Sequence, residues 1–250
     1  MKTLSNKNIV ITGASSGIGR QIAVEASKCG ANIILIARNN DRLEETLRKL
    51  DIGNHQAFSL DITNYSKLDA VISESVQRIG KISCFVHAAG IELTMPFRNM
   101  KPEYYDQLFS VNVIAGLELA RIISKKSFIN ETGGSFVFIG SVMGKFGKEG
   151  KIAYCASKAA LTSSIKAMAL ELSSKKIRCN AILPGVVKTS LVENMFASLP
   201  DSSVEEIIKQ HPLGLGLPED IAHIAVFLLS DKAQWITGSE IIIDGGYSAG

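Results

Sequence analysis

The stretch Thr12-Gly13-Ala14-Ser15-Ser16-Gly17-Ile18-Gly19 decides the fold of this 250-residue chain. It follows a short apolar run, residues 7–12, and opens into a helical pattern over residues 17–29. Glycines permit a sharp turn between a strand and a helix, and the free N–H groups at a helix N-terminus favour an anion such as a pyrophosphate. The order Gly-x-x-x-Gly-x-Gly matches that mechanism, although the common dinucleotide fingerprint is G-x-G-x-x-G. An ordinary strand–helix turn is the alternative interpretation. We expect the turn to contact a dinucleotide through Gly13, Ser15, Ser16, Gly17, Ile18 and Gly19.

Short runs rich in Ile and Val alternate with longer amphipathic stretches along the whole chain. Continuous apolar strands separated by helices are typical of a parallel sheet that is covered on both faces. The sequence therefore predicts an α/β fold, a doubly wound parallel sheet of about seven strands with helices on both faces. The predicted strands are 7–12, 32–37, 56–60, 83–87, 135–140, 177–183 and 240–244. The predicted helices are 17–29, 41–50, 65–79, 102–129, 151–174 and 218–229.

No repeat, low-complexity tract or Pro/Gly/Ser-rich linker divides the chain, so we expect a single domain over residues 1–250. The most irregular region begins at Pro184 and holds Pro200 and Pro212 around two short helical patterns. A loop-and-helix insertion late in such a fold is a candidate substrate lid, which we place at about residues 186–217.

The composition excludes several classes of protein. A net charge of +3 lacks the basic excess of a nucleic-acid binder, and 46% hydrophobic content excludes a disordered chain. No stretch approaches the length of a membrane span, and the N-terminus has no signal-peptide core. The four cysteines, Cys29, Cys84, Cys155 and Cys179, are widely separated and form no CxxC pair, so we expect no metal and reduced, buried thiols in a cytoplasmic protein.

The second predicted strand ends in Ile36-Ala37-Arg38-Asn39, with no acidic residue at its end. An acidic group here would bind a ribose 2′-hydroxyl and repel a 2′-phosphate, whereas Arg38 suits that phosphate. We therefore expect NADP(H) in preference to NAD(H), with a solvated arginine as the alternative interpretation. Asp61-Ile62-Thr63 follows the third strand and suits an adenine, although Asp-x-Thr is also an ordinary helix cap.

Tyr154 and Lys158 are four residues apart in a helical segment and therefore project from one face. A phenol has a pKa of about 10, and a neighbouring ammonium together with a positively charged nicotinamide would lower it. Ser141 follows the fifth strand, at the edge of the sheet where ligands bind, and is placed to hydrogen-bond a reacting oxygen. A lone Tyr-x-x-x-Lys is common by chance, so its weight comes from the other motifs.

Together these residues closely resemble the short-chain dehydrogenase/reductase family, from Asn8 to Tyr247, and the resemblance implies a Rossmann fold. Residues 12–19 are similar to its glycine motif and Asp61 to its adenine contact. The resemblance implies that Ser141 orients a carbonyl, Tyr154 protonates its oxygen and Lys158 binds the nicotinamide ribose. It also implies that Asn112 supports a water-linked proton relay, that the segment with Pro184, Gly185, Val187 and Thr189 grips the nicotinamide carboxamide, and that residues 243–246 form the usual last strand and turn.

The chain departs from the family pattern after its fourth strand, where Asn-Asn-Ala-Gly is replaced by His87-Ala88-Ala89-Gly90. The small residues Ala88, Ala89 and Gly90 still allow close approach to a cofactor, but two side-chain amides are lost. We expect His87 to pack or hydrogen-bond at the strand end rather than act as a second general base.

Within the family the pattern is most like the 3-oxoacyl-acyl-carrier-protein reductases, so a 3-oxoacyl thioester is one expected substrate. The alternative is a sugar, polyol or other secondary alcohol, and a remote alternative is a non-catalytic NADP-binding scaffold or sensor. Lys175, Lys176 and Arg178 are the basic cluster that an acidic carrier protein would need, or else a solvated helix end. Glu131, before the fifth strand, would oppose such a carrier.

Two further groups of residues concern the substrate pocket and the assembly of subunits. Apolar residues around the lid either line an apolar substrate pocket or simply pack the lid down: Val142, Met143, Phe146, Leu191, Met195, Phe196 and Leu199. The resemblance implies a two-fold-symmetric homotetramer, built on helices whose small residues let another helix approach: Ala153, Ala156, Ala160, Ser163, Ser164 and Ala167.

Overall fold

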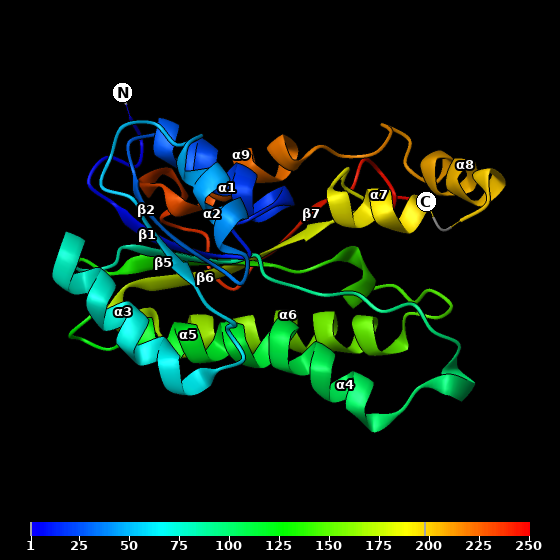
Figure 1. The fold of residues 1–250 in the computed structure, drawn as a ribbon, viewed down its shortest axis with the longest axis horizontal. Helices are drawn as coiled ribbons and strands as arrows, with labels where there is room; N and C mark the ends of the chain where they lie inside the picture. The colour runs from blue at the N-terminus through cyan, green and yellow to red at the C-terminus, as the bar shows by residue number, and fades with distance from the viewer. Residues whose placement is uncertain (1, 198) are drawn as a thin grey trace.

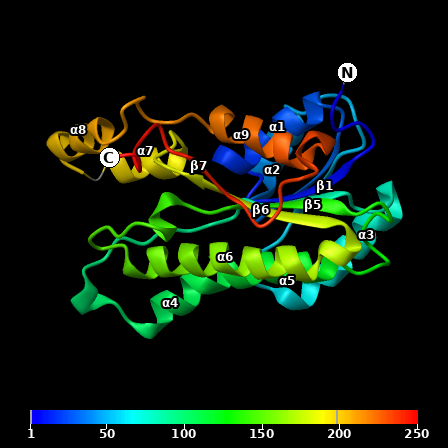
Figure 2. The same ribbon diagram turned by 180° about the vertical axis from the view of Figure 1, so that it is seen from behind.

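The computed structural model describes residues 2–197 and 199–250, so Met1 and Ser198, which falls inside the expected lid, lie outside the described residues. The described chain forms three layers, with a sheet between two layers of helices (Figures 1 and 2). This is the doubly wound α/β fold that the alternation of apolar and amphipathic stretches predicts.

Within the described residues the sheet has seven strands in the order β3-β2-β1-β4-β5-β6-β7, and every neighbouring pair is parallel. Chain order reverses between β1 and β4, which is where ligands bind in such sheets. Each expected strand is confirmed to within one residue at either end. The strands are β1 Asn8–Thr12, β2 Asn32–Ala37, β3 Gln56–Ser59, β4 Cys84–His87, β5 Gly134–Ile139, β6 Ile177–Pro184 and β7 Glu240–Ile243.

Helices cover both faces of the sheet because the central strands are apolar on both sides. One face is covered by α1 (Gly17–Lys28), α2 (Asn40–Leu47) and α9 (Pro218–Leu229). The other is covered by α3 (Tyr65–Ile79), α4 (Pro102–Phe109), α5 (Ala115–Ile123) and α6 (Ile152–Glu171), and a separate cluster of buried side chains fills each interface. Two short helices, α7 (Ser190–Phe196) and α8 (Asp201–Lys209), extend beyond the carboxyl edge of the sheet (Figure 1).

The helix expected over residues 102–129 is confirmed only as far as Ile123, and it is not a single regular helix. A π-helical turn, Ser110–Ile114, separates α4 from α5, and α5 ends at Ile123. The chain leaves the helix because its next residues extend the sheet: the Ile82 N–H donates to the Phe128 carbonyl at 2.8 Å, and the Asn130 N–H donates to the Ile82 carbonyl at 2.8 Å. Pairing across so many residues cannot be seen in the local helical pattern.

The turn between β1 and α1 packs directly against the chain that follows β4. Gly13 has a φ of 67°, and a Cβ there would lie 2.7 Å from the Ala89 nitrogen. A Cβ on Gly19 would lie 2.4 Å from the Gly13 carbonyl oxygen. The protein's own backbone therefore requires glycine at both positions, before any ligand is considered.

None of the helices in the described part of the chain has the length and apolarity that a membrane span requires. All four cysteines are free thiols. Cys84 and Cys179 are buried as expected, whereas Cys29 and Cys155 are half-buried.

Candidate active site

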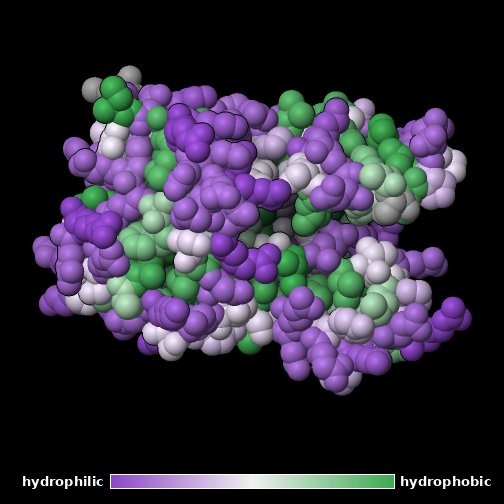
Figure 3. All heavy atoms as spheres, in the orientation of Figure 1, coloured by the Kyte–Doolittle hydropathy of each residue, from purple (hydrophilic) through white to green (hydrophobic). Residues whose placement is uncertain are grey.

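A cavity of about 1000 Å³ opens at the carboxyl edge of the sheet, beneath α7 and α8. The space-filling view shows the molecule hollowed between these helices and the layer of α4 and α6, with hydrophobic and hydrophilic surface side by side at the rim (Figure 3). The predicted site residues that line it come from the ends of six strands, the segments that follow them, and α6: Gly13, Ser15, Ser16, Gly17, Ile18, Gly19, Arg38, Asn39, Asp61, Ile62, Ala88, Ala89, Gly90, Ser141, Tyr154, Lys158, Pro184, Gly185, Val187 and Thr189. Of the predicted residues, Asn112 alone does not line it.

The N-terminus of α1 forms the floor of one end of the cavity. The side chain of Ser16, its N-cap residue, makes no capping hydrogen bond, and the first turn of α1 contains no acidic residue. The first N–H groups of the helix and its dipole therefore suit an anion, as a dinucleotide pyrophosphate requires. These residues fit a dinucleotide cofactor.

The far end of this groove carries two arginines. Arg38 and Arg42 both line the cavity and are exposed. Asn39 lies between them, and its side chain accepts a hydrogen bond from the Arg42 N–H at 2.9 Å, which caps α2. Asp61 accepts from the N–H and the hydroxyl of Thr63 at 2.9 and 2.7 Å, and these bonds lower the pKa of its carboxyl.

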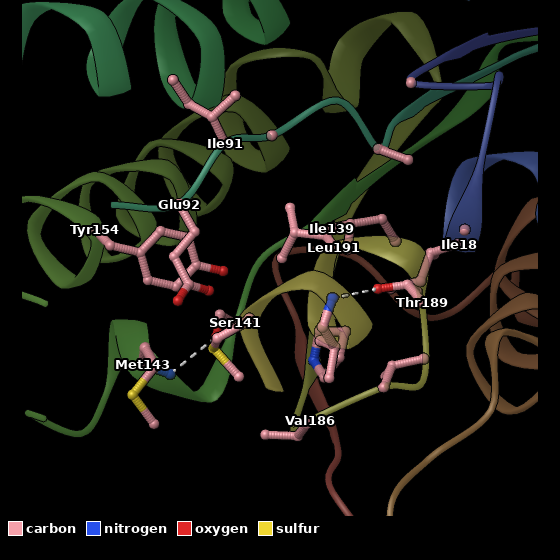
Figure 4. A pocket seen from close by; sticks show the side chains of 18 of the residues that line it. Ile18, Ile91, Glu92, Ile139, Ser141, Met143, Tyr154, Val186, Thr189 and Leu191 are labelled. Atoms are coloured by element: carbon pink, nitrogen blue, oxygen red, sulfur yellow. Dashed lines mark hydrogen bonds between the residues drawn. The ribbon is translucent and has the colours of Figure 1, made fainter. Parts of the chain in front are cut away.

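Ser141, Tyr154 and Lys158 converge on the middle of the cavity. Ser141 lies in the segment that follows β5 and is 8% exposed. Its hydroxyl accepts a hydrogen bond from the Met143 N–H at 3.1 Å. Tyr154 and Lys158 project from one face of α6, as their spacing predicts, and Lys158 Nζ lies 5.7 Å from the centre of the Tyr154 ring. The close-up shows Tyr154 and Ser141 facing the same space (Figure 4).

Burial moves the pKa values of this pair in opposite directions. Burial and the negative charge of Glu92 raise the pKa of Tyr154, and a hydrogen bond with Ser141 opposes the shift. Burial lowers the pKa of Lys158 to about 8, while Glu92 acts in the other direction. Lys158 Nζ donates to the Ile139 carbonyl at 2.9 Å. In the protein alone the phenol is therefore harder to ionise than expected, because burial and the Glu92 carboxylate both oppose its ionisation.

Asn112 lies behind the cavity wall, fully buried in the π-helical turn. Its side-chain oxygen accepts from the Ile91 N–H at 2.8 Å, and its amide donates to the Ile91 carbonyl at 2.9 Å and to the Ser157 hydroxyl at 3.0 Å. The side chain thus clamps the loop after β4 to the catalytic helix. Its side chain therefore holds the cavity wall from behind and does not line the cavity itself.

His87 takes the place of an amide at the end of β4 and is completely buried. Its Nδ1 lies 3.0 Å from the Thr12 hydroxyl, and the ring faces the backbone of Val111 and Asn112 in the π-helical turn. Burial and the charge of Lys158 lower its pKa to about 3, so the ring is neutral at physiological pH. The prediction that His87 hydrogen-bonds at the strand end is confirmed.

The other half of the cavity is lined by both apolar and charged side chains. Five of the expected apolar residues line it, namely Val142, Met143, Leu191, Met195 and Leu199, whereas Phe146 and Phe196 do not. Phe146 packs edge-on against Tyr247 instead, with ring centres 6.5 Å apart. Polar and charged residues also line this half: Glu92, Thr94, Lys148, Glu149, Lys151, Ser203, Glu206 and Gln210. The expectation that apolar residues around the lid line the cavity is thus confirmed for five of the seven, and charged side chains lie among them.

His211 ties the segment that carries α7 and α8 to the chain after β6. Its Nδ1 donates to the Ile207 carbonyl at 2.8 Å and its Nε2 accepts from the Val186 N–H at 3.2 Å. The ring also stacks on Tyr247, with centres 5.0 Å apart. One buried side chain thus connects α8, the loop after β6 and the C-terminal turn.

The basic cluster expected beside the entrance does not form as predicted. Arg178 points inward, where its guanidinium donates to the carbonyls of Leu228 at 2.6 Å and Ile236 at 3.2 Å. Lys175 donates to the Ser124 carbonyl at 3.1 Å. The reason is that carbonyls at the end of α9 and in the loop after it need donors, and Arg178 on β6 is close enough to supply them.

Arg42, Glu92 and Lys151 line the cavity and were not among the predicted site residues. Local signals were present, since Arg42 follows Arg38 by four residues, Glu92 follows Gly90 by two, and Lys151 lies one helical turn before Tyr154. Among the described residues, no three His, Cys, Asp or Glu side chains are grouped so as to hold a metal ion.

A family model described as Enoyl-(Acyl carrier protein) reductase matches residues 13–248. The 3-oxoacyl-[acyl-carrier-protein] reductase FabG of Thermotoga maritima is 32% identical over 246 residues, which cover 97% of this chain and 98% of the relative. The NAD-dependent glycerol dehydrogenase of Listeria innocua is also 32% identical over 246 residues, which cover 98% of this chain and 95% of the relative.

Among solved structures, a 7α-hydroxysteroid dehydrogenase complexed with NADH and 7-oxo glycochenodeoxycholic acid superposes with a TM-score of 0.91. It is 28% identical, and the match covers 98% of this chain and 95% of that one.

The buried ammonium of Lys158 predicts a stability cost that depends on pH. Its pKa falls from 10.5 to about 8 on folding, so below pH 8 the folded state carries a charge that it holds less readily than the unfolded state, by roughly 3 kcal/mol. Stability should therefore rise as pH increases from 8 to 10.5. We expect Lys158→Met to raise the free energy of unfolding at pH 7 by about 1–3 kcal/mol, because the lost bond to Ile139 offsets part of the gain.

Urea unfolding of the cofactor-free protein at pH 7 and pH 10.5 measures this effect, with Lys126→Met, an exposed lysine, as the control. The advantage of Lys158→Met should shrink at the higher pH. A variant that is less stable than the native chain at pH 7 would contradict the assignment of a buried charge.

Proposed function

Because the chain belongs to the short-chain dehydrogenase/reductase family of NAD(P)-dependent oxidoreductases, we propose that it interconverts a ketone and a secondary alcohol with NADP(H) as the hydride carrier. The observation that carries this proposal is the convergence of Ser141, Tyr154 and Lys158 beside the dinucleotide groove of one cavity. The retained triad argues against the remote alternative of a non-catalytic scaffold or sensor.

The cavity residues divide the chemistry among them. The nicotinamide, when bound, gives or takes the hydride at the reacting carbon. Ser141 donates a hydrogen bond to the substrate oxygen and holds it beside the Tyr154 hydroxyl. Tyr154 delivers a proton to that oxygen in reduction and removes one in oxidation, and its raised pKa keeps it protonated for the first task. Lys158 binds the ribose hydroxyls and supplies a positive charge near the phenol.

Asn112 supports this arrangement from behind the wall. By holding both the N–H and the carbonyl of Ile91, it keeps the loop after β4 at a constant distance from α6. The family resemblance also implies that Asn112 supports a water-linked proton relay. π-Helical turns of this kind are frequent at functional sites.

The cofactor residues favour NADP(H). Arg38 and Arg42 are exposed in the adenosine end of the groove, where two guanidinium groups suit a ribose 2′-phosphate. Asp61 and Ile62 lie where they would receive the adenine, and residues 184–189 where they would hold the carboxamide. The L-rhamnose 1-dehydrogenase of a Sphingomonas strain, 30% identical over 98% of both chains, is named as an NAD(P)(+) enzyme.

Two substrate classes have support. FabG relatives favour a 3-oxoacyl thioester, whereas the glycerol and rhamnose dehydrogenases favour a polyol or sugar. Because the Arg178 guanidinium points inward and donates to the Leu228 carbonyl, it is not available at the surface to bind an acidic carrier protein. Residues 186–217 act as the lid of one domain over either substrate, with His211 as its anchor.

The proposal includes a homotetramer in the cytoplasm. An exposed stripe of small and apolar residues runs along α6 at helical spacing, and it comprises Ile152, Ala156, Ser163, Ala167 and Leu170. Other exposed apolar side chains lie near α9 and β7, namely Phe227, Trp235 and Ile242. Two separate patches are what a two-fold-symmetric tetramer needs. The four free thiols suit a reducing compartment.

Replacing Tyr154 by Phe should lower turnover of any accepted ketone by roughly 10²–10⁴-fold, because the proton donor is lost. The dissociation constant of NADPH should change by less than about threefold, since the ring remains. Stopped-flow NADPH oxidation and fluorescence titration measure the two quantities. Tyr105→Phe, which lies outside the cavity, is the control, and near-native turnover by Tyr154→Phe would rule out the mechanism.

Removing both arginines of the adenosine end should convert the cofactor preference. In Arg38→Gln/Arg42→Gln the KM for NADPH should rise by about 10–100-fold, as loss of charge-assisted hydrogen bonds predicts, while the KM for NADH changes little. Arg48→Gln, at the end of α2, is the matched control. A native chain that prefers NADH would refute the assignment.

The stripe on α6 should be buried between subunits. Sedimentation velocity at micromolar concentration should show four 26.9 kDa chains together, and Ala167→Glu should reduce this to a smaller species by burying a charge. A native monomer would contradict the tetramer.

A further inference from the structure

The cavity holds an ion pair that the proposed reaction does not use. Glu92 and Lys151 form a salt bridge between the loop after β4 and the start of α6, and both line the cavity. Their side chains are 20% and 13% exposed, so the pair is largely removed from solvent. Burying such charges costs free energy that an apolar pair would not incur, which makes the pair's presence here informative.

The position of Glu92 is set by the residues that build the reaction centre. It directly follows Ile91, whose backbone is clamped by Asn112, and Lys151 lies three residues before Tyr154. The close-up shows the Glu92 carboxylate beside the Tyr154 ring and turned toward the same space as Ser141 (Figure 4). Its charge acts on both Tyr154 and Lys158. A group bound to Glu92 therefore lies in the same part of the cavity as a substrate oxygen held by Ser141 and Tyr154.

The pair retains hydrogen-bonding capacity of both kinds. Lys151 Nζ donates to Glu92 Oε1 and to the Thr94 hydroxyl at 3.2 Å, which leaves one of its three N–H groups. Within the described residues Glu92 Oε2 accepts no hydrogen bond. A strong acceptor and a donor thus lie side by side, and a hydroxyl group, which both donates and accepts, satisfies the two together.

We propose that Glu92 and Lys151 select a substrate that carries a hydroxyl on the carbon next to the reacting one, so that the chain acts on vicinal diols and α-hydroxy ketones of the polyol class. An unsubstituted alkyl or acyl chain in this place would displace the water that hydrogen-bonds to both charged groups and would offer no hydrogen bonds in exchange. This cost disfavours the 3-oxoacyl class. This inference rests on the proposed function, whose reaction centre it surrounds.

The test compares two substrates that differ by one hydroxyl, 2-hydroxycyclohexanone and cyclohexanone, together with an acetoacetyl thioester. With the preferred reduced nicotinamide, kcat/KM of the native chain should be at least about tenfold higher for the hydroxy ketone. Glu92→Gln keeps the shape but removes the charge, and it should bring that ratio to within about threefold. Glu103→Gln, an exposed carboxylate on α4, should leave the ratio unchanged.

A binding measurement separates this inference from the proposed function. Calorimetric titration of the protein with bound reduced nicotinamide should show tighter binding of trans-1,2-cyclohexanediol than of cyclohexanol, and Glu92→Gln should remove the difference. The alcohols cannot react with reduced cofactor, so this result does not require catalysis. Equal binding of the two alcohols, or a native preference for cyclohexanone or the thioester, would overturn the inference. Failure of every ketone to react, with the diol still preferred, would overturn only the proposed function.

Discussion

The two hydrogen bonds between Asn112 and the backbone of Ile91 are the contact on which the reaction centre depends. They join a π-helical turn, the loop after β4 and, through Ser157, the helix that carries Tyr154 and Lys158. A buried amide that satisfies a backbone N–H and a carbonyl at once cannot be displaced without leaving polar groups unpaired. The loop is therefore held on one side by Asn112 and on the other by the glycine turn, which approaches Ala88 and Ala89 closely.

His87 and Gly116 show how the fold accommodates a bulky ring where a smaller amide is usual. A Cβ on Gly116 would lie 2.6 Å from the imidazole Cδ2, so a helix glycine makes room for the ring. The ring replaces the missing amide on one side, where its Nδ1 meets the Thr12 hydroxyl, while its buried Nε2 faces the π-helical turn without a hydrogen-bond partner among the described residues. It packs against Phe85 and Phe138, with ring centres 6.3 and 6.1 Å away, and its burial lowers its pKa and keeps it neutral. The substitution thus braces the end of β4 against β1 through one hydrogen bond and adds no titrating group.

Periodicity and turn chemistry were sufficient to predict the sheet, because apolar strands bounded by Gly, Asp or Asn are local signals. They failed at residues 102–129, where pairing of residues 128–130 with Ile82 ends the helix. Motif spacing placed most of the site, since the loops after parallel strands meet at one edge. Motif spacing did not predict that Arg178 turns inward, because that direction depends on the carbonyls of α9. Nor did it predict the ion pair of Glu92 and Lys151, which joins residues 59 apart. Each miss is a contact between distant segments.

The electrostatics of the cavity reflect competition between burial and charge. Lys158 alone does not make Tyr154 acidic, because desolvation of the phenol and the carboxylate of Glu92 both oppose ionisation. Glu92 at the same time stabilises the protonated form of Lys158, which burial would otherwise weaken further. The same carboxylate therefore favours a protonated phenol and a charged ammonium, the states that the proposed proton transfer and ribose binding require. If Glu92 contacts the substrate as proposed, the same side chain also acts on the protonation states of Tyr154 and Lys158, so substrate choice and acid–base chemistry are coupled through it.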